Sequence, residues 1–179
     1  MSHCTPVSVR SEFFNFTENH LAGLVTIGQV SVVPGLNIEA TRLLSSVLRY
    51  SRQPSVGVLA VEAGALPLLL GLLNSPHSQL INEMLVALNL LTAVRPPRPE
   101  VTENIDPEFL STKIRDVLTM EEEKCPKQVK YNAISLVNSI LQWDDQSIKD
   151  HFCKHELKEE IRKFDGDLDI VQKMMELMA

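Results

Sequence analysis

The residues best suited to chemistry lie near the end of the chain, where His151, Cys153 and His155 form an H-x-C-x-H cluster. Imidazole nitrogens and thiolate sulfurs are preferred ligands of Zn²⁺, so this spacing raises the question of a metal site. We expect a helical region from 147 to 164, on which positions 151 and 155 share a face while 153 points elsewhere. Two converging ligands fall short of the usual three or four. We therefore predict ordinary surface histidines and no metal.

No other pattern predicts catalysis. The sequence contains no G-x-S-x-G turn, no Gly-rich loop that would cradle a phosphate, and no H-E-x-x-H pair. Each of these would place a nucleophile, a phosphate or a zinc ion in a defined local structure. We expect a protein that is not an enzyme and that needs no cofactor.

The bulk composition indicates a folded intracellular protein. Of the 179 residues, 44% are hydrophobic and 22% are charged, which disfavours both disorder and membrane insertion. Three cysteines, an odd number, indicate a reducing compartment, and the N-terminus has no basic start followed by an apolar core. We predict a cytoplasmic location.

The negative charge lies entirely in the second half of the chain. Residues 1–95 carry five basic and five acidic side chains, whereas residues 96–179 carry twelve and eighteen, so the excess of 18 − 12 = 6 acids falls there. This balance disfavours a nucleic acid and favours a basic partner. The acids Glu121 to Glu123, Asp144, Asp145 and Asp150 either steer such a partner or only solvate outer helices.

The elements that would position any site are helices, most clearly in the stretch VEAGALPLLLGLLNSPHSQLINEMLVALNLLTA at 61–93. Gly64 is expected to close a preceding helix, and Pro67 to lie in the first turn of a buried helix that ends at Leu73. A break at 74–76 then leads to an amphipathic helix from His77 to Ala93. We expect Leu69 and Leu88 to be fully buried, so Leu69→Asp should unfold the molecule.

Further helices are expected on both sides. A short one runs from 20 to 30 and is closed by Pro34-Gly35; Asn37 then caps a helix to Tyr50. The apolar set of that helix is Ile38, Ala40, Leu43, Leu44, Val47 and Leu48. The others span 107–120, 129–141, 147–164 and 168–178, with Trp143 at the edge of the core and a Met-rich last helix plugging the end.

The long helices repeat. Aligning Ala40, Met84 and Ala133 gives steps of 84 − 40 = 44 and 133 − 84 = 49, near the ~40 to 47 residues of armadillo and HEAT repeats. This predicts an all-α, armadillo-type α-solenoid of roughly four units, at about 18–52, 53–95, 96–143 and 144–179. Residues 1–17 form an N-terminal arm. The first unit lacks a polar cap, so we expect either self-association through that end or shielding by Phe13, Phe14 and Phe16.

The central stretch resembles an armadillo repeat, since it carries V-x-A-G-A-hydrophobic-P-x-L-x-x-L-L-x-S followed by E-x-L-x-A-L. The order EATRLLSSVLRYS, VEAGALPLLLGLL, NEMLVALNLLTA, KYNAISLVNSIL is similar to the C-terminal repeats of the smg GDS family, over about residues 18–165. That family comprises armadillo-type GDP-dissociation stimulators and chaperones of small GTPases. The resemblance implies a right-handed superhelix of three-helix repeats and a Rho- or Rap-type GTPase partner with a basic or prenylated tail.

The sequence departs from its relatives in two ways. Members of the family have many more repeats. In addition, the Trp and Asn with which many armadillo proteins grip a peptide backbone are replaced by Arg42 and Ser46, Val86 and Leu90, and Ser135 and Ser139. We therefore do not expect an importin-like or catenin-like peptide ladder.

Stacked third helices line the concave surface of such folds, and their exposed side is the predicted protein-binding site. It comprises Arg42, Ser46, Arg49, Asn82, Val86, Asn89, Tyr131, Ser135, Asn138 and Gln142. Arg42 and Arg49 are the strongest candidates, although a stabilising role in the groove would equally explain them. The alternative function is a generic armadillo scaffold that binds another protein.

Overall fold

The computed structural model describes residues 18–30, 33–51, 54–93, 99–143, 145–164 and 167–178, and these residues form helices without any strand. The predicted arm at 1–17, with its phenylalanines, lies outside the described residues. The helices are α1 (Glu18–Val30), α2 (Pro34–Tyr50), α3 (Pro54–Glu62), α4 (Ala65–Leu72), α5 (Ser78–Thr92), α6 (Pro99–Thr102), α7 (Pro107–Thr119), α8 (Lys127–Leu141), α9 (Gln146–Phe152), α10 (His155–Arg162) and α11 (Leu168–Leu177).

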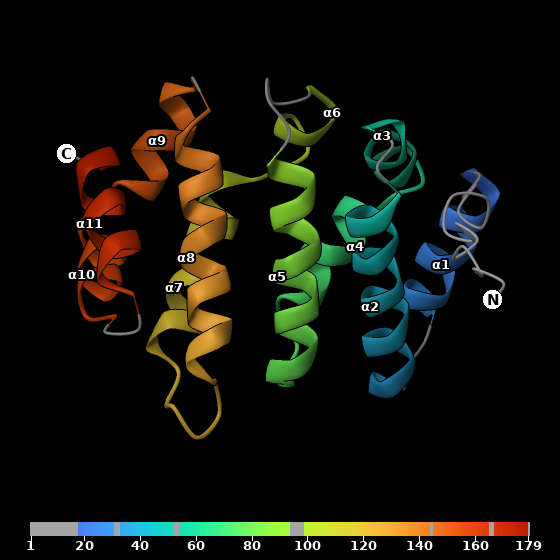
Figure 1. The fold of residues 1–179 in the computed structure, drawn as a ribbon, viewed down its shortest axis with the longest axis horizontal. Coiled ribbons are helices and arrows are strands. Elements are labelled where there is room, and N and C mark those ends of the chain that lie inside the picture. The colour runs from blue at the N-terminus through green and yellow to red at the C-terminus, as the bar shows by residue number, and fades with distance from the viewer. Residues whose placement is uncertain are drawn as a thin grey trace, which may run out of the picture.

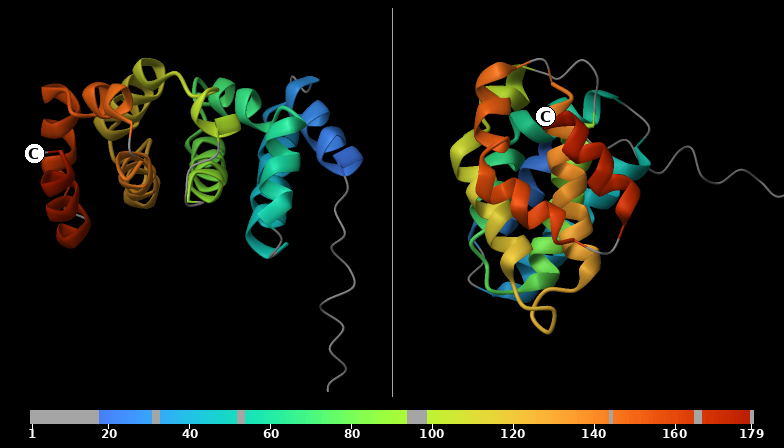
Figure 2. Two further views of the ribbon diagram at one scale, coloured as in Figure 1. Left: turned by 90° about the horizontal axis from the view of Figure 1, so that it is seen from above. Right: turned by 90° about the vertical axis from the view of Figure 1, so that its left-hand side faces the viewer.

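The helices stack along one axis instead of surrounding a single centre. Figure 1 shows α2, α5 and α8 side by side, with α1 at one end of the stack and α10 and α11 at the other. Seen from above, α1, α4 and α7 form a second layer behind them (Figure 2). We call α2, α5 and α8 the third helices. They begin at residues 34, 78 and 127, so their steps are 78 − 34 = 44 and 127 − 78 = 49, which confirms the predicted repeat.

The core runs continuously through the stack and is densest around the central stretch. Gly64 has a φ of 86°, the left-handed conformation that allows the chain to turn sharply between α3 and α4. Leu69 and Leu88 are fully buried, as predicted, and each contributes ~1.5 to 3 kcal/mol by burial. Gly28 allows α1 to approach α4 closely, because a Cβ there would lie 2.7 Å from Leu68 Cδ2.

The start of α2 differs from the prediction. Pro34 and Gly35 open the helix instead of separating two elements, and the residue before the first turn is Val33, not Asn37. Proline is equally suited to a first helical turn, where its missing N–H is not needed. Asn37 therefore lies inside the helix, and its Oδ1 is buried without a hydrogen-bond partner among the described residues.

Two further predictions were wrong. The single helix at 147–164 is in fact two, because α9 ends at Phe152 and α10 begins at His155. The carboxylate of Asp145 starts α9 by accepting a hydrogen bond from the Ile148 amide at 3.1 Å. Leu43, assigned to the apolar face of α2, is 46% exposed.

No described helix is by itself long and apolar enough to span a membrane; α3 and α4 pass that test only as a pair, bent by 72°.

Candidate protein-binding face

The third helices bring the ten predicted binding residues onto adjacent positions. Because the helices start 44 and 49 residues apart, residues separated by these steps occupy the same position on each helix. Arg42, Val86 and Ser135 form one such row across α2, α5 and α8. We call the ten residues together the third-helix face: Arg42, Ser46, Arg49, Asn82, Val86, Asn89, Tyr131, Ser135, Asn138 and Gln142.

None of the ten belongs to the core. Arg49 and Gln142 are exposed, and the other eight are half-buried. Half-burial is expected where third helices pack side by side, since each helix covers the flanks of its neighbour but not the outward stripe. The ten residues therefore lie outside the core on three helices, α2, α5 and α8, which stand side by side in Figure 1.

Arg42 connects the first two third helices. Its Nη1 lies 2.8 Å from Glu39 Oε1 on the same helix, and its Nε lies 3.4 Å from Glu83 Oε1 on α5. The Glu83 side chain is only 18% exposed, whereas those of Arg42 and Glu39 are 40% and 65% exposed. An ion pair this accessible to water adds at most about 1 kcal/mol. Its main effect is to fix the guanidinium at the seam between α2 and α5.

A set of side-chain amides connects α5 to α8 in the same way. Asn89 Nδ2 donates to the carbonyl oxygens of Leu85, at 2.8 Å, and Asn132, at 2.9 Å. Asn132 Nδ2 donates in turn to Asn82 Oδ1 at 2.8 Å. Gln128 Nε2 donates to Asn132 Oδ1 at 3.2 Å. Asn82 and Asn89 therefore help to hold neighbouring units in register.

Sequence reasoning missed the residues that hold this face together. Glu39, Glu83 and Asn132 occupy one row of the repeat, and they supply the contacts to Arg42 and to the amides of α5. A signal for them exists in the sequence, because these three polar residues directly precede Ala40, Met84 and Ala133, which define the repeat alignment. A row of equivalent polar residues does not by itself show which side chains meet.

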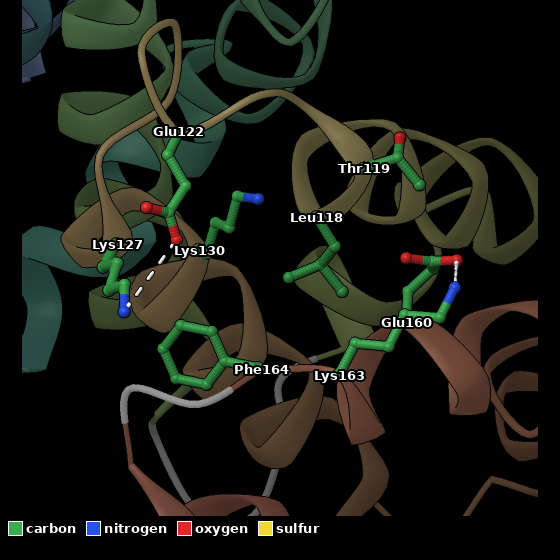
Figure 3. Close-up of a pocket in the computed structure, with 8 residues that line it drawn as sticks. All are labelled: Leu118, Thr119, Glu122, Lys127, Lys130, Glu160, Lys163 and Phe164. Carbon is green, nitrogen blue, oxygen red and sulfur yellow. Dashed lines mark hydrogen bonds and ion pairs between the residues drawn. The ribbon is translucent and has the colours of Figure 1, made fainter.

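A separate cavity of about 380 Å³ opens between the end of α7, the start of α8 and α10 (Figure 3). Leu118 and Phe164 form its apolar part. Its charges are paired with one another: Lys127 lies 3.9 Å from Glu122, and Lys163 lies 2.7 Å from Glu160. Lys130 Nζ donates to the Met120 carbonyl at 2.6 Å. The charged side chains of this cavity are therefore engaged with one another or with the backbone.

The H-x-C-x-H cluster is divided between two helices. His151 and His155 lie on different helices, α9 and α10, and among the described residues no three His, Cys, Asp or Glu side chains could hold a metal ion together. His151 Nδ1 lies 2.8 Å from the Ser147 carbonyl oxygen. Burial raises the pKa of the Cys153 thiol, and it also raises the pKa of the Cys125 thiol. A raised thiol pKa leaves less of the thiolate that binds metals and attacks electrophiles.

The acidic residues of the second half are spread over the outside of the stack. Glu121, Glu122 and Glu123 are exposed on the turn between α7 and α8, where Glu121 pairs with Lys124 at 2.6 Å. Asp150 accepts a hydrogen bond from Gln146 Nε2 at 2.8 Å. Asp144 lies outside the described residues.

Among the curated relatives that match, two are similar to part of the chain. Rap1 GTPase-GDP dissociation stimulator 1-B of Xenopus laevis is 28% identical over 109 residues, which is 60% of this chain. Rap1 GTPase-GDP dissociation stimulator 1-A of the same species is 30% identical over 105 residues, 58% of the chain. These matches confirm the resemblance to the smg GDS family. They cover only 17% and 16% of the relatives, so the chain spans a small part of their length. No protein-family model matches the chain.

Solved structures similar to this one include armadillo proteins. A designed armadillo repeat protein in complex with the peptide (KR)4 superposes with a TM-score of 0.70 over 90% of this chain and 65% of its own, at 17% identity. A computationally designed armadillo repeat protein for modular peptide recognition gives a TM-score of 0.52 over 89% of this chain and 81% of its own, at 13% identity. The all-α armadillo-type solenoid predicted from the sequence is therefore confirmed.

Proposed function

We propose that this chain is a non-catalytic binding module that docks a small GTPase on its third-helix face and promotes the release of GDP. The observation that carries the proposal is the similarity to two proteins named as GDP dissociation stimulators of the Rap1 GTPase, at 28% and 30% identity over about 60% of the chain. The relatives are far longer, so the activity and partners of the whole proteins are part of the proposal.

The third-helix face is suited to recognising a folded protein. The row of equivalent positions across α2, α5 and α8 offers a fixed guanidinium at Arg42, an aliphatic side chain at Val86 and a hydroxyl at Ser135. Tyr131 adds an aromatic side chain, a residue type that is common at protein interfaces. Since Arg42, Asn82 and Asn89 are already held by neighbours, little side-chain freedom is lost when a partner binds.

Promoting GDP release needs no reactive group on this chain. A binder that prefers the GTPase conformation with a loosened nucleotide site shifts the population toward that conformation. The coupling is reciprocal: the factor by which the binder weakens GDP binding is the factor by which GDP weakens the binder. A hundredfold effect requires a preference of about 2.7 kcal/mol between the two conformations, which a few well-placed contacts supply.

The charge of the second half favours a particular kind of partner. Small GTPases of the Rho or Rap type with a basic tail would be attracted by the acids on the α7–α8 turn and on α9. Such attraction acts on the rate of association and weakens with added salt. We place this interaction in the cytoplasm, in keeping with the free thiols of Cys125 and Cys153.

A binding experiment separates this function from that of a scaffold for an unrelated protein. The chain is immobilised and exposed to Rho- and Rap-type GTPases, each loaded with GDP or freed of nucleotide, with and without a prenylated tail. We expect at least one GTPase to bind more tightly in the nucleotide-free form. If every GTPase fails to bind, or if binding ignores the nucleotide, the proposal is wrong and the scaffold reading replaces it.

The docking surface is tested by Val86→Arg, which places a long charged side chain between Arg42 and Ser135 on the central third helix, α5. Central interface contacts contribute ~2 kcal/mol or more, so we expect the affinity to fall by roughly thirtyfold. The matched control is Thr112→Arg at an exposed position of α7, in the second layer of the stack. Equal losses in the two variants would mean that the GTPase binds elsewhere.

A further inference from the structure

Exposed apolar side chains gather at the end of the stack formed by α1 and α2. Five of the six large hydrophobic residues found exposed in the described part of the chain lie there: Ile27, Val33, Leu36, Leu43 and Tyr50. The sixth is Leu177, at the opposite end. Scattered exposed hydrophobic residues are normal in folded proteins, whereas a group of them in one place marks a surface that another molecule covers.

Three of these residues form a stripe along α2. Leu36, Leu43 and Tyr50 are spaced seven residues apart, which is two helical turns, so they share one edge of the helix. We call these three residues the end stripe. The other edge of α2 carries Arg42, which reaches Glu83 on α5. The end stripe therefore faces away from α5, at the end of the stack where α1 also lies.

The same positions are buried in the next two third helices. The counterparts of Leu36 are Leu80 and Val129, which are 2% and 3% exposed, against 52% for Leu36 itself. Those of Leu43 are Ala87 and Leu136, both fully buried.

Tyr50 also has a counterpart in the third unit, directly after α8. Trp143, just after that helix, is 1% exposed, against 64% for Tyr50, and its Nε1 donates to the Thr92 carbonyl at the end of α5 at 3.4 Å. These positions are thus the ones that pack on the preceding third helix. The end stripe is the same packing edge, and no third helix lies against it among the described residues.

The two ends of the stack differ in polarity. At the opposite end, α11 turns Asp169, Gln172, Lys173 and Glu176 toward solvent. A head-to-tail contact between copies would bury these charges against the end stripe, which is unfavourable. A head-to-head contact would instead pair two apolar surfaces and close with two-fold symmetry, the commonest arrangement among protein oligomers.

We propose that the end stripe is the dimer interface of this chain, formed by the α2 helices of two copies packed antiparallel about a two-fold axis at Leu43. Because Leu36 and Tyr50 lie seven residues on either side of Leu43, each meets the other across the axis. Arg49 then lies opposite residue 37 of the second copy, within one turn of its Glu39. Glu39 already pairs with Arg42 of its own chain, but its side chain is 65% exposed, so its carboxylate can also face Arg49 of the second copy.

Sedimentation velocity of the full chain across the micromolar range tests the interface. We expect a species of twice the 20.1 kDa chain mass that dissociates on dilution. Leu43→Asp should yield a monomer with unchanged helicity and melting temperature at low concentration, since the side chain is exposed in the single chain. Leu177→Asp is the matched control and should leave the dimer intact.

Several outcomes would overturn the proposal. A wild-type chain that stays monomeric throughout would contradict it, and so would a dimer that survives Leu43→Asp or that is dissolved by Leu177→Asp. Deletion of residues 1–17 identifies the other occupant. If the wild type is a monomer and the deletion raises binding of a hydrophobic dye, the N-terminal segment covers the end stripe and the dimer does not exist.

The contact on the axis is tested by Leu43→Cys, which should form an interchain disulfide under oxidation, whereas Leu177→Cys should not.

Discussion

The two edges of α2 have opposite surroundings. One edge packs on α5 and is fixed there by the contact of Arg42 with Glu83. The other carries Leu36, Leu43 and Tyr50, which are about half-exposed or more. Periodicity within a helix therefore predicts which side chains are built for packing. It does not predict whether a neighbouring helix is present to pack against them.

The comparison is most strongly tested in the middle of the stack by Leu69→Asp. Leu69 is fully buried, so the substitution would leave a carboxylate without a partner in an apolar core. We expect a loss of several kcal/mol, enough to unfold a domain whose total stability is ~5 to 15 kcal/mol. Circular dichroism should show loss of helix at room temperature. Retention of most of the helicity would contradict the continuous core.

Leu136→Ala and Leu43→Ala compare the same repeat position in α8 and α2. Leu136 is fully buried at the seam with α5, so its truncation should cost ~2 to 5 kcal/mol. Leu43 is exposed in the single chain, and its truncation should cost less than about 0.5 kcal/mol in a monomer. Urea unfolding at a concentration below that of dimer formation gives both values. Equal losses would mean that the end stripe is covered within one chain.

Trp143→Phe and Tyr50→Phe extend the comparison to hydrogen bonding. The first removes the indole N–H that donates to the Thr92 carbonyl and also reduces a buried side chain. We expect a loss of ~1 to 2 kcal/mol. The second removes a hydroxyl from an exposed ring and should leave the unfolding midpoint unchanged. A stable Trp143→Phe variant would show that this contact does not hold α8 to α5.

Arg42→Gln should have the smallest effect. It removes the ion pairs with Glu39 and Glu83, which are accessible to water and contribute at most about 1 kcal/mol. The loss should shrink in high salt, because screening already weakens the pairs in the wild type. Arg49→Gln is the control and should not change stability when measured below the concentration of dimer formation. If Arg42→Gln lowered the free energy of unfolding by clearly more than about 1 kcal/mol, the Arg42 side chain would have a larger structural role than its exposure indicates.

The architecture was accessible from sequence because the repeat signals agree with one another. The apolar stripes, the glycine at 64 and the steps of 44 and 49 all predict the same stack, and the third helices begin at those intervals. Local signals failed where one residue type serves two roles. Pro34 was taken for a break although proline also opens helices, and nothing like Pro or Gly marks the break at Cys153 and Lys154.

The candidate face was predictable in position but not in detail. The outward stripe of each third helix follows from helical geometry, so the ten residues could be named in advance. The contacts of Arg42 with Glu83 and of Asn89 with Asn132 depend on the rotation and spacing of neighbouring helices. Helical periodicity does not determine these quantities. For the same reason, Leu43 was assigned to the core without regard to what lies beyond it.

The central claim is that the third-helix face accelerates the loss of GDP from a small GTPase, and stopped-flow release of a fluorescent GDP analogue tests it directly. We predict that the wild-type chain speeds release from at least one Rho- or Rap-type GTPase and that the rate saturates with its concentration. Val86→Arg should abolish most of this gain, while Thr112→Arg retains it. Release that is unaffected by the chain for every GTPase, or equally fast with Val86→Arg, would contradict the account.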